Sequence, residues 1–208
     1  AGWTVCVLWL FGSASSAVAE RQELTLANGD RYDGEVIDGV LEGFGRYTWA
    51  DGKRYEGNFS AGKRQGFGSL TWPNGDRYQG NFTDNRIQGE GVFLWANGDR
   101  YEGSFVANQR SGQGVMRWQG GQRYEGQFEA GLMDGLGEYR WPDGTSYKGM
   151  FALDRRSGLG VLIYPDASVF TGFFLEDRRH GMGVEQRNNS PLSLQRWQED
   201  VLQESQAM

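Results

Sequence analysis

The sequence is poor in the residues that build metal centres, disulfides and nucleophilic catalytic sites. Its 208 residues include one cysteine, Cys6, and one histidine, His180. A structural zinc site needs four cysteine or histidine ligands, and a disulfide needs two cysteines. A histidine-based nucleophile needs serine or threonine and an acid beside it, and nothing around His180 favours that over an exposed turn. We therefore expect no enzyme activity, no metal and no cofactor.

Proline is scarce, and positive charge is outnumbered by negative charge. Four prolines against 33 glycines, with 14% aromatic residues, do not fit a disordered chain, and the three-residue repeat of collagen is missing. The formal net charge of −6 gives no overall attraction to DNA, RNA or an anionic bilayer. We expect no nucleic-acid partner, and binding to phospholipid would require a local basic patch.

Charge is absent from residues 1–19, which we interpret as a secretory signal peptide. The apolar run from Trp3 to Phe11 is followed by Ala17-Val18-Ala19, which has the small-x-small form of a cleavage site. A mature chain beginning at Glu20 would be exported, to the periplasm or the cell exterior. An uncleaved membrane anchor is the alternative, because a span needs about 20 apolar residues. A basic start and an initiator Met are missing, so we expect the N-terminus to be incomplete.

A period of 23 residues runs through most of the remaining chain. The tryptophan column consists of Trp49, Trp72, Trp95, Trp118, Trp141 and Tyr164. The tyrosine column consists of Tyr32, Tyr55, Tyr78, Tyr101, Tyr124, Tyr147 and Phe170. Glycine always follows two residues later, at Gly34, Gly57, Gly80, Gly103, Gly126, Gly149 and Gly172. Two residues further stands the phenylalanine column: Val36, Phe59, Phe82, Phe105, Phe128, Phe151 and Phe174. This alternation with period two predicts a β-strand.

A second strand is predicted in each repeat by a Gly-x-Gly pair, from which apolar residues of the same parity lead to the tryptophan column. The pairs are Gly43/Gly45, Gly66/Gly68, Gly89/Gly91, Gly112/Gly114, Gly135/Gly137, Gly158/Gly160 and Gly181/Gly183. Each repeat is therefore predicted to be a β-hairpin. A lone hairpin is marginally stable in water, so the repeats must stack. We expect the glycines to let an aromatic ring from the adjacent repeat lie against bare backbone.

The connections between strands are also periodic. Pro73-Asn74-Gly75-Asp76 and its equivalents fit a type I turn closed by a glycine at positive φ. At the other end of each hairpin stands the turn column: Gly39, Gly62, Asn85, Asn108, Gly131, Asp154 and Asp177. Only glycine, asparagine and aspartate occur there, and these residues tolerate the left-handed region. We expect positive φ at every member.

The repeat resembles the MORN (membrane occupation and recognition nexus) family. Residues 55–77, YEGNFSAGKRQGFGSLTWPNGDR, and residues 78–100, YQGNFTDNRIQGEGVFLWANGDR, carry its pattern of Y-x-G-x-F, a turn, G-x-G, an aromatic residue and P/A-D/N-G. Seven copies in register span about Leu24 to Gly183. The resemblance implies an all-β, elongated, solenoid-like array of antiparallel hairpins without chemistry of its own. Proteins of this family act as scaffolds, some are dimeric, and some have been proposed to bind acidic phospholipids.

Three segments are expected: residues 1–19 as signal peptide or anchor, 20–186 as the repeat array, and 187–208 as a C-terminal tail. In the tail, Ser190 and Pro191 suit the start of a helix, and Leu194, Trp197 and Val201 lie on one helical stripe. We predict a short amphipathic helix that caps the last strand edge. A helix that binds a partner or forms a dimer is the alternative.

Two motifs resemble ligand-binding sites but are better explained by the repeat. Gly57 to Arg64 has the glycine and lysine spacing of a phosphate-binding loop, but Arg64 stands where serine or threonine should hold Mg²⁺. The Asn-Gly-Asp triplets leave Asp30, Asp76 and Asp99 isolated, without the oxygen cluster that Ca²⁺ requires. A column of carboxylates could line a site, although we favour a solvated ladder with neighbouring arginines: Asp33, Glu56, Glu102 and Glu125.

Basic side chains gather near one end of the predicted hairpins, and we call this set the basic edge. It consists of Lys63, Arg64, Arg86, Arg110, Arg155, Arg156, Arg178 and Arg179. A positive stripe would suit phosphate head groups or an acidic protein, whereas an edge that only confers solubility needs no ligand. We favour a non-catalytic scaffold that binds unidentified protein partners through an aromatic, charge-laddered surface. Peripheral binding of anionic phospholipid through the basic edge is the alternative.

Overall fold

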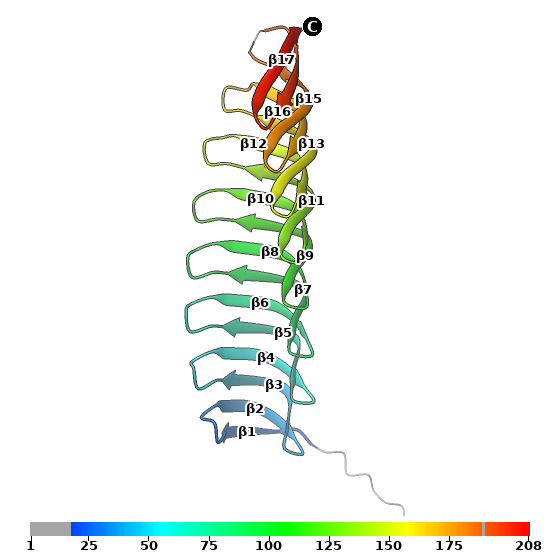
Figure 1. Cartoon of the computed structure of the whole chain (residues 1–208). Helices are drawn as coiled ribbons and strands as arrows, with labels where there is room; N and C mark the ends of the chain where they lie inside the picture. The colour runs from blue at the N-terminus through cyan, green and yellow to red at the C-terminus, as the bar shows by residue number, and fades with distance from the viewer. Residues whose placement is uncertain (1–17, 189) are drawn as a thin grey trace, which may run out of the picture.

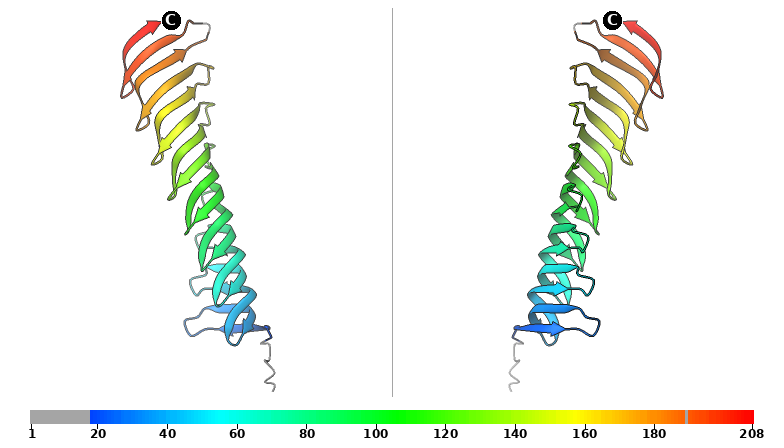
Figure 2. Two further views of the ribbon diagram at one scale, coloured as in Figure 1. Left: turned by 90° about the vertical axis from the view of Figure 1, so that its right-hand side faces the viewer. Right: turned by 90° about the vertical axis from the view of Figure 1, so that its left-hand side faces the viewer.

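The protein forms one long antiparallel sheet in which every strand pairs with its neighbours in sequence. The computed structural model describes residues 18–188 and 190–208, and these contain 17 strands and no helix. The strands follow one another as a continuous meander, from the pair at Glu20↔Val36 to the pair at Gln198↔Val201. Figure 1 shows the resulting elongated stack, and Figure 2 shows that it twists along its length. The expected all-β array of antiparallel hairpins is confirmed.

Seven short strands carry the tyrosine and phenylalanine columns. In each of them the members of the tyrosine, glycine and phenylalanine columns are buried and their neighbours are more exposed, as period-two alternation requires. They are β2 (Arg31–Ile37), β4 (Arg54–Ser60), β6 (Arg77–Thr83), β8 (Arg100–Val106), β10 (Arg123–Glu129), β12 (Ser146–Ala152) and β14 (Val169–Leu175).

Seven longer strands carry the Gly-x-Gly pairs. Within a hairpin the register shifts between Gly57 and Phe59, and the same shift recurs in the later repeats. Between hairpins the register is continuous, as from Gly66↔Phe82 to Thr71↔Arg77. Such irregularities bend and twist a strand pair. The strands are β3 (Val40–Thr48), β5 (Lys63–Thr71), β7 (Arg86–Leu94), β9 (Gln109–Arg117), β11 (Leu132–Arg140), β13 (Arg155–Ile163) and β15 (Arg178–Gln186).

The two ends of the sheet extend beyond the seven repeats. β1 (Glu20–Thr25) pairs with β2 at one end. At the other end, β16 (Ser193–Gln198) and β17 (Val201–Ala207) form an eighth hairpin. The predicted C-terminal helix is therefore wrong. Trp197 follows Phe174 by 23 residues and Asp200 follows Asp177 by 23, so the tail continues two columns of the repeat.

The turn column has positive φ at every member, from 66° at Asp154 to 88° at Gly131, as predicted. The residue before each member is also left-handed, including Ala61 at 48° and Leu153 at 50°. Positive φ at both central residues defines the type I′ turn, whose twist matches that of the flanking strands. From Gly62 onward, each turn also contacts the preceding repeat, as where the Asn85 backbone N–H donates to the Arg64 carbonyl at 3.1 Å.

The glycine two residues after each tyrosine and the second glycine of each Gly-x-Gly pair make room for the tyrosine of their own hairpin, not for a ring of the adjacent repeat as the sequence suggested. A Cβ on Gly57 would lie 2.6 Å from the Tyr55 hydroxyl, and a Cβ on Gly68 would lie 2.5 Å from a carbon of the same ring. The Tyr55 hydroxyl donates to the Asn58 carbonyl at 2.9 Å, which fixes the ring across the two strands. The same arrangement recurs for Tyr78 over its own pair of glycines.

The core is an unbroken zigzag of aromatic rings along the sheet. The Phe59 ring packs edge-on against Tyr55 of its own repeat, at 5.1 Å between centroids, and against Tyr32 of the preceding repeat, at 5.4 Å. Edge-to-face pairs of this kind are favourable beyond the area they bury. The zigzag continues to Phe170, whose last partner is Trp197 at 6.0 Å. Each repeat thus completes the core of its neighbour.

The signal peptide or anchor predicted for residues 1–19 falls almost wholly outside the described residues, and export remains a prediction. Within the part of the chain that the structure describes, no helix is long and apolar enough to cross a bilayer.

Candidate functional site

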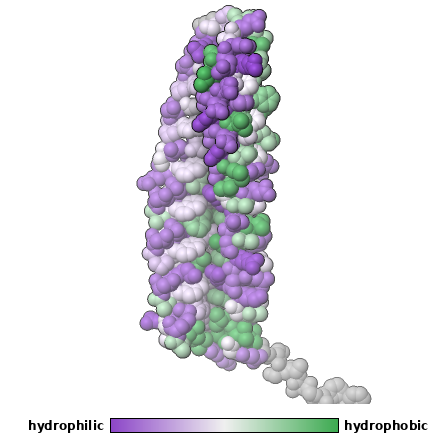
Figure 3. Space-filling model, viewed as in Figure 1, coloured by the Kyte–Doolittle hydropathy of each residue, from purple (hydrophilic) through white to green (hydrophobic). Residues whose placement is uncertain are grey.

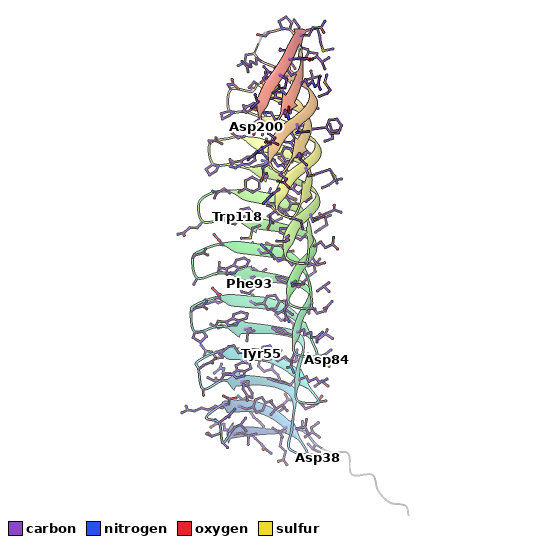
Figure 4. All side chains as sticks on the ribbon, viewed as in Figure 1. Asp38, Tyr55, Asp84, Phe93, Trp118 and Asp200 are labelled. Carbon is purple, nitrogen blue, oxygen red and sulfur yellow. The ribbon has the colours of Figure 1, made fainter. Side chains whose placement is uncertain are left out.

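The two faces of the sheet differ in their side chains. We call the face with the tyrosine, phenylalanine and tryptophan columns the inner face, and the other the outer face. The tyrosines are fully buried, but the tryptophan column is only partly buried and packs along the margin of the core. Figure 4 places Tyr55, Phe93 and Trp118 in one line along the molecule, with Asp38 and Asp84 on the opposite side. Figure 3 shows apolar and intermediate side chains running lengthwise between hydrophilic margins.

Between residues 41 and 162 the inner face has a second period of two repeats, or 46 residues, which alternates arginine with aromatic residues. The period ends in the last repeat, where Arg179 and Glu185 continue the two columns. Near the turn column, one column of the inner face alternates aliphatic residues with arginine: Leu41, Arg64, Ile87, Arg110, Met133 and Arg156. Nearer the tryptophans, another alternates aromatic with aliphatic residues: Tyr47, Leu70, Phe93, Met116, Tyr139 and Leu162. Each of these repeats therefore carries one aliphatic residue and one larger side chain, which is either an arginine or an aromatic ring.

Packing over the buried tyrosines explains this alternation. Tyr78 is accompanied by Phe93 of its own repeat, with ring centroids 6.5 Å apart. Tyr55, one repeat earlier, has no aromatic residue at that position and is covered by Arg64, whose guanidinium carbon lies 5.7 Å from the ring centroid. The same arrangement holds for Arg110 over Tyr101. One large side chain per repeat, either aromatic or arginine, thus fills the space above the core.

The arginines also stack on the tryptophan column. The guanidinium carbon of Arg64 lies 5.6 Å from the centroid of Trp49, and that of Arg110 lies 5.9 Å from Trp95. Cation–π contacts favour this placement. Between these stacks the aromatic rings gather, because Phe93 lies 5.3 Å from Trp72 and 4.5 Å from Trp95. Trp118, Tyr139 and Trp141 repeat the cluster two repeats later.

Two of these arginines lack an acidic partner. Arg156 and Arg179 pair with Asp177 and Asp200 at 3.2 and 3.0 Å. Among the described residues, Arg64 and Arg110 have no carboxylate within salt-bridge distance, and they donate instead to backbone carbonyls of the next turn. Burial lowers the pKa of both guanidinium groups from its usual value, although they remain cationic. Across the residues that the structure describes, the inner face therefore holds two half-buried guanidinium groups without a salt bridge, and the Asp154 carboxylate acts on Arg110 only from beyond salt-bridge distance.

The rest of the basic edge lies on the outer face, so the eight residues do not form one surface. Lys63 is adjacent to Arg64 in β5 and points to the opposite side. Lys63 pairs with Asp84 at 2.8 Å. Arg155 pairs with Glu176 at 3.2 Å and Arg178 with Glu199 at 3.1 Å.

Arg86 is exposed on the same face. Leu132 occupies the position of the basic residue in its repeat, and Leu153 occupies the position of the carboxylate that would pair with it. Much of the predicted stripe is thus neutralised by the following repeat.

The column of carboxylates forms the charge ladder that the sequence suggested. Glu102 and Glu125 pair with Arg100 and Arg123, two residues earlier on the same strand. Glu56 instead pairs across strands with Arg46 at 3.1 Å. These exposed side chains are typical of surface pairs that contribute little to stability.

The Asn-Gly-Asp triplets link successive repeats. Within the turn, the Asp76 backbone N–H donates to the Asn74 side-chain oxygen at 3.1 Å, and the Asn74 side-chain amide donates to the Asp76 carboxylate at 2.9 Å. The other Asp76 carboxylate oxygen accepts from the Ala96 N–H of the next repeat at 2.8 Å. The carboxylates of Asp30 and Asp99 likewise accept from the backbone N–H groups of Ala50 and Gln119. Within the described ranges no three acidic, histidine or cysteine side chains cluster as metal ligands would.

The outer face carries exposed apolar side chains that the sequence reasoning missed. The residue between each pair of glycines points outward, and it is apolar towards both ends of the array: Phe44, Phe67, Leu136, Leu159 and Met182. Leu136 lies opposite Met150, and Leu159 lies opposite Phe173, which is 51% exposed. In the middle of the array the equivalent residues are Glu90 and Gln113. These residues recur every 23 positions and could have been recognised as a column, but the aromatic columns of the inner face are the stronger pattern.

The last repeat replaces core aromatic residues with a polar network. Glu185 stands in the column of Tyr47 and is 5% exposed, and Gln195 donates to it at 2.7 Å. The Trp197 indole N–H donates to Gln195 at 3.0 Å, while Arg187 approaches Glu185 at 3.1 Å. These residues adjoin a hollow on the inner face that is lined by Tyr164, Ser168 and Arg179. The arrangement accommodates Gln195 where other repeats have a strand glycine.

Comparisons with known proteins agree with the repeat architecture. The family model described as MORN repeat matches residues 32–54, 55–77, 78–100, 101–123, 124–146, 147–169 and 170–190. No curated protein matches the sequence.

Solved structures show only a distant likeness. The Drosophila melanogaster SAS-4 (dCPAP) TCP domain, solved with a proline-rich motif of Ana2, is 15% identical with a TM-score of 0.47, over 91% of this chain and 97% of that one. The wild-type TCP10 domain of Danio rerio CPAP, solved with a STIL peptide, is 15% identical with a TM-score of 0.34, over 91% and 100%. Likeness at this level carries no argument about binding. On the seven matched repeats, the chain belongs to the MORN repeat family.

Proposed function

We propose that this protein is a non-catalytic scaffold that binds protein partners through its inner face. The observation that carries the proposal is the row of partly exposed tryptophans together with Arg64 and Arg110, which lack an acidic partner. Tryptophan and arginine are the residues most often responsible for binding energy in protein interfaces. An occupant that covers the aromatic clusters and brings carboxylates to the arginines would satisfy both features.

Binding of anionic phospholipid is less well supported than binding of protein. The outward-facing residues Lys63, Arg155 and Arg178 already pair with carboxylates of the next repeat. A bilayer would have to compete with these pairs, in a chain of net charge −6. The stacked arginines are recessed between rings, where a narrow peptide can reach them more readily than a flat membrane surface. Export to the periplasm or cell exterior, and a homodimer, remain parts of the proposal supported by the sequence pattern and family alone.

The test separates the two faces of the sheet. The full chain is used to recover a partner from the source cells, and the purified partner is then titrated against two double variants. Trp72→Ala with Trp118→Ala alters the inner face, and Phe67→Ala with Leu159→Ala alters the outer face. We expect the inner-face variant to bind at least about tenfold more weakly, and the outer-face variant to bind as wild type does.

Loss of stability is controlled by comparing thermal unfolding of both variants. Acrylamide quenching of the unmodified protein gives an independent measure, because a partner on the inner face protects its tryptophans. Unchanged quenching, with binding lost only in the outer-face variant, would assign the function to the outer face.

A further inference from the structure

We propose that the inner face binds a polyproline II segment whose carboxylates are six residues apart, an inference that rests on the proposed function. The spacing of the repeats carries it. One repeat contains two strands, and strands lie about 4.8 Å apart, so equivalent side chains recur every ~9.6 Å along the stack. A polyproline II helix rises ~3.1 Å per residue with three residues per turn, so one turn covers ~9.3 Å. Every third residue of such a segment therefore meets the same position in successive repeats.

Other peptide conformations do not match this step. An extended strand rises about 3.4 Å per residue, so one repeat corresponds to nearly three residues, and alternate repeats would meet side chains that point away. An α-helix rises about 1.5 Å per residue with 3.6 residues per turn, and the six or seven residues that cover one repeat do not bring the same face back. Of these three conformations, the polyproline II helix has the pitch that comes nearest to the length of one repeat.

The unpaired arginines add a requirement for charge at a spacing of two repeats. Arg64 and Arg110 are 46 residues apart, which is two repeats. Two repeats correspond to ~19 Å, and six residues of polyproline II cover ~18.6 Å. Residues six apart lie on the same side of that helix, so two carboxylates at this interval can reach both guanidinium groups. Hydrogen bonds between charged groups are about twice as strong as neutral ones, and half-burial of the arginines favours them further.

The aromatic clusters supply surfaces for the residues between the two carboxylates. Trp72 follows Arg64 in the same repeat, and Phe93 and Trp95 lie in the next one, before Arg110, with neighbouring ring centroids 5.3 and 4.5 Å apart. Proline-rich segments dock on such aromatic surfaces because their conformation is already ordered before binding. A segment that spans only these repeats follows a short part of the twist seen in Figure 2.

The experiment uses synthetic, fluorescein-labelled polyproline peptides and the full chain. One peptide carries two aspartates six residues apart, a second carries them five apart, and a third replaces both with lysine. A threonine-rich strand-forming peptide with aspartates six apart tests the conformation. Fluorescence anisotropy is measured at about 0.15 M salt, and again at higher salt. We expect the first peptide to bind at least about tenfold more tightly than each of the others, as expected for the loss of one charge-assisted contact.

Variants assign the effect to the arginines. Arg64→Met and Arg110→Met keep an apolar side chain over the rings and should each remove most of the preference for the six-residue spacing. Arg86→Met alters an exposed arginine on the outer face of the same hairpin end and is the matched control. Equal binding of the two aspartate spacings, tighter binding of the strand-forming peptide, or a preference that survives both inner-face variants would overturn the proposal.

The outcome also distinguishes this inference from the proposed function. If no polyproline peptide binds while a natural partner still shields the tryptophans from acrylamide, the conformation of the ligand is wrong and the scaffold function stands. If the natural partner leaves the tryptophans accessible as well, the inner face is not the binding surface.

Discussion

Arg64 lies over the indole of Trp49 although the two residues belong to different repeats, with 5.6 Å between the guanidinium carbon and the ring centroid. The same arginine donates to the carbonyl of Asn85 in the following repeat at 2.7 Å. One side chain therefore connects three consecutive hairpins. Stability in this protein arises largely between repeats, as expected for arrays in which each unit contacts only its neighbours.

Gly68→Ala is expected to destabilise the array by about 2–3 kcal/mol, because the added methyl group would collide with the buried ring of Tyr55. Urea unfolding followed by tryptophan fluorescence measures the loss. Gly52→Ala is the control, since a Cβ there meets no atom within 4 Å and only the positive φ of 89° opposes it. In a Tyr55→Ala background the effect of Gly68→Ala should shrink. An equal loss in both backgrounds would contradict the assignment of the clash.

Trp197→Ala is expected to cost about 3 kcal/mol, because Trp197 is 7% exposed and closes the aromatic zigzag against Phe170. Trp197→Phe should retain most of the stability, as phenylalanine fills this column elsewhere. Val201→Ala, at a side chain 60% exposed in β17, serves as the control and should have little effect. Hydrogen exchange should show protected amides in β16. Rapid exchange throughout residues 193–198 would be inconsistent with an eighth hairpin.

Alkaline pH is expected to unfold the protein through its buried tyrosines. Burial raises the pKa of Tyr55, Tyr101 and Tyr147 to about 12, against about 10 for an unfolded chain. The folded state therefore binds these protons more tightly, and their contribution to stability is complete below pH 10 and falls as the pH rises towards 12. Absorbance at 295 nm should show tyrosine ionisation and loss of β-structure in one transition. Early ionisation of all tyrosines without unfolding would exclude this linkage.

Anionic vesicles are expected to leave the protein in solution at about 0.15 M salt, because Lys63, Arg155 and Arg178 on the outer face are already paired and surface charges are screened. Co-sedimentation with phosphatidylserine vesicles measures this. If the wild type sediments and a variant with Arg155, Arg156, Arg178 and Arg179 changed to Glu does not, the phospholipid alternative is correct. Sedimentation that survives these four changes would indicate a different membrane contact.

Sequence reasoning reached the fold wherever local chemistry repeats. The alternation of Tyr55, Gly57 and Phe59 specifies both strand and buried face, and residues such as Asn85 specify the turn. The left-handed residue before each turn column was not predictable, because Ala61 and Leu153 do not favour that conformation. The helix error has a similar origin. Leu194, Trp197 and Val201 fit a helical stripe, and Ser193 and Gln195 replace the tyrosine and glycine that would have marked the eighth hairpin.

The candidate site was only partly predictable. The basic edge was recognised as a set of residues, but a linear pattern does not show which of Lys63 and Arg64 stacks on rings and which pairs with a carboxylate. That division depends on strand parity and on the bulge that turns the hairpin end. The absence of an acidic partner for Arg64 and Arg110, within the part of the chain described, appears only when the next repeat is in place.

The alternation of arginine and aromatic residues on the inner face sets a rule for how this array can change length. Inserting a single hairpin after Arg64 would place two arginine layers or two aromatic layers next to each other, a succession that the chain shows only where Arg179 follows Arg156. Inserting two hairpins preserves the phase. We therefore expect the array between residues 41 and 162 to accept the gain of two MORN repeats with less repacking above the tyrosines than the gain of one.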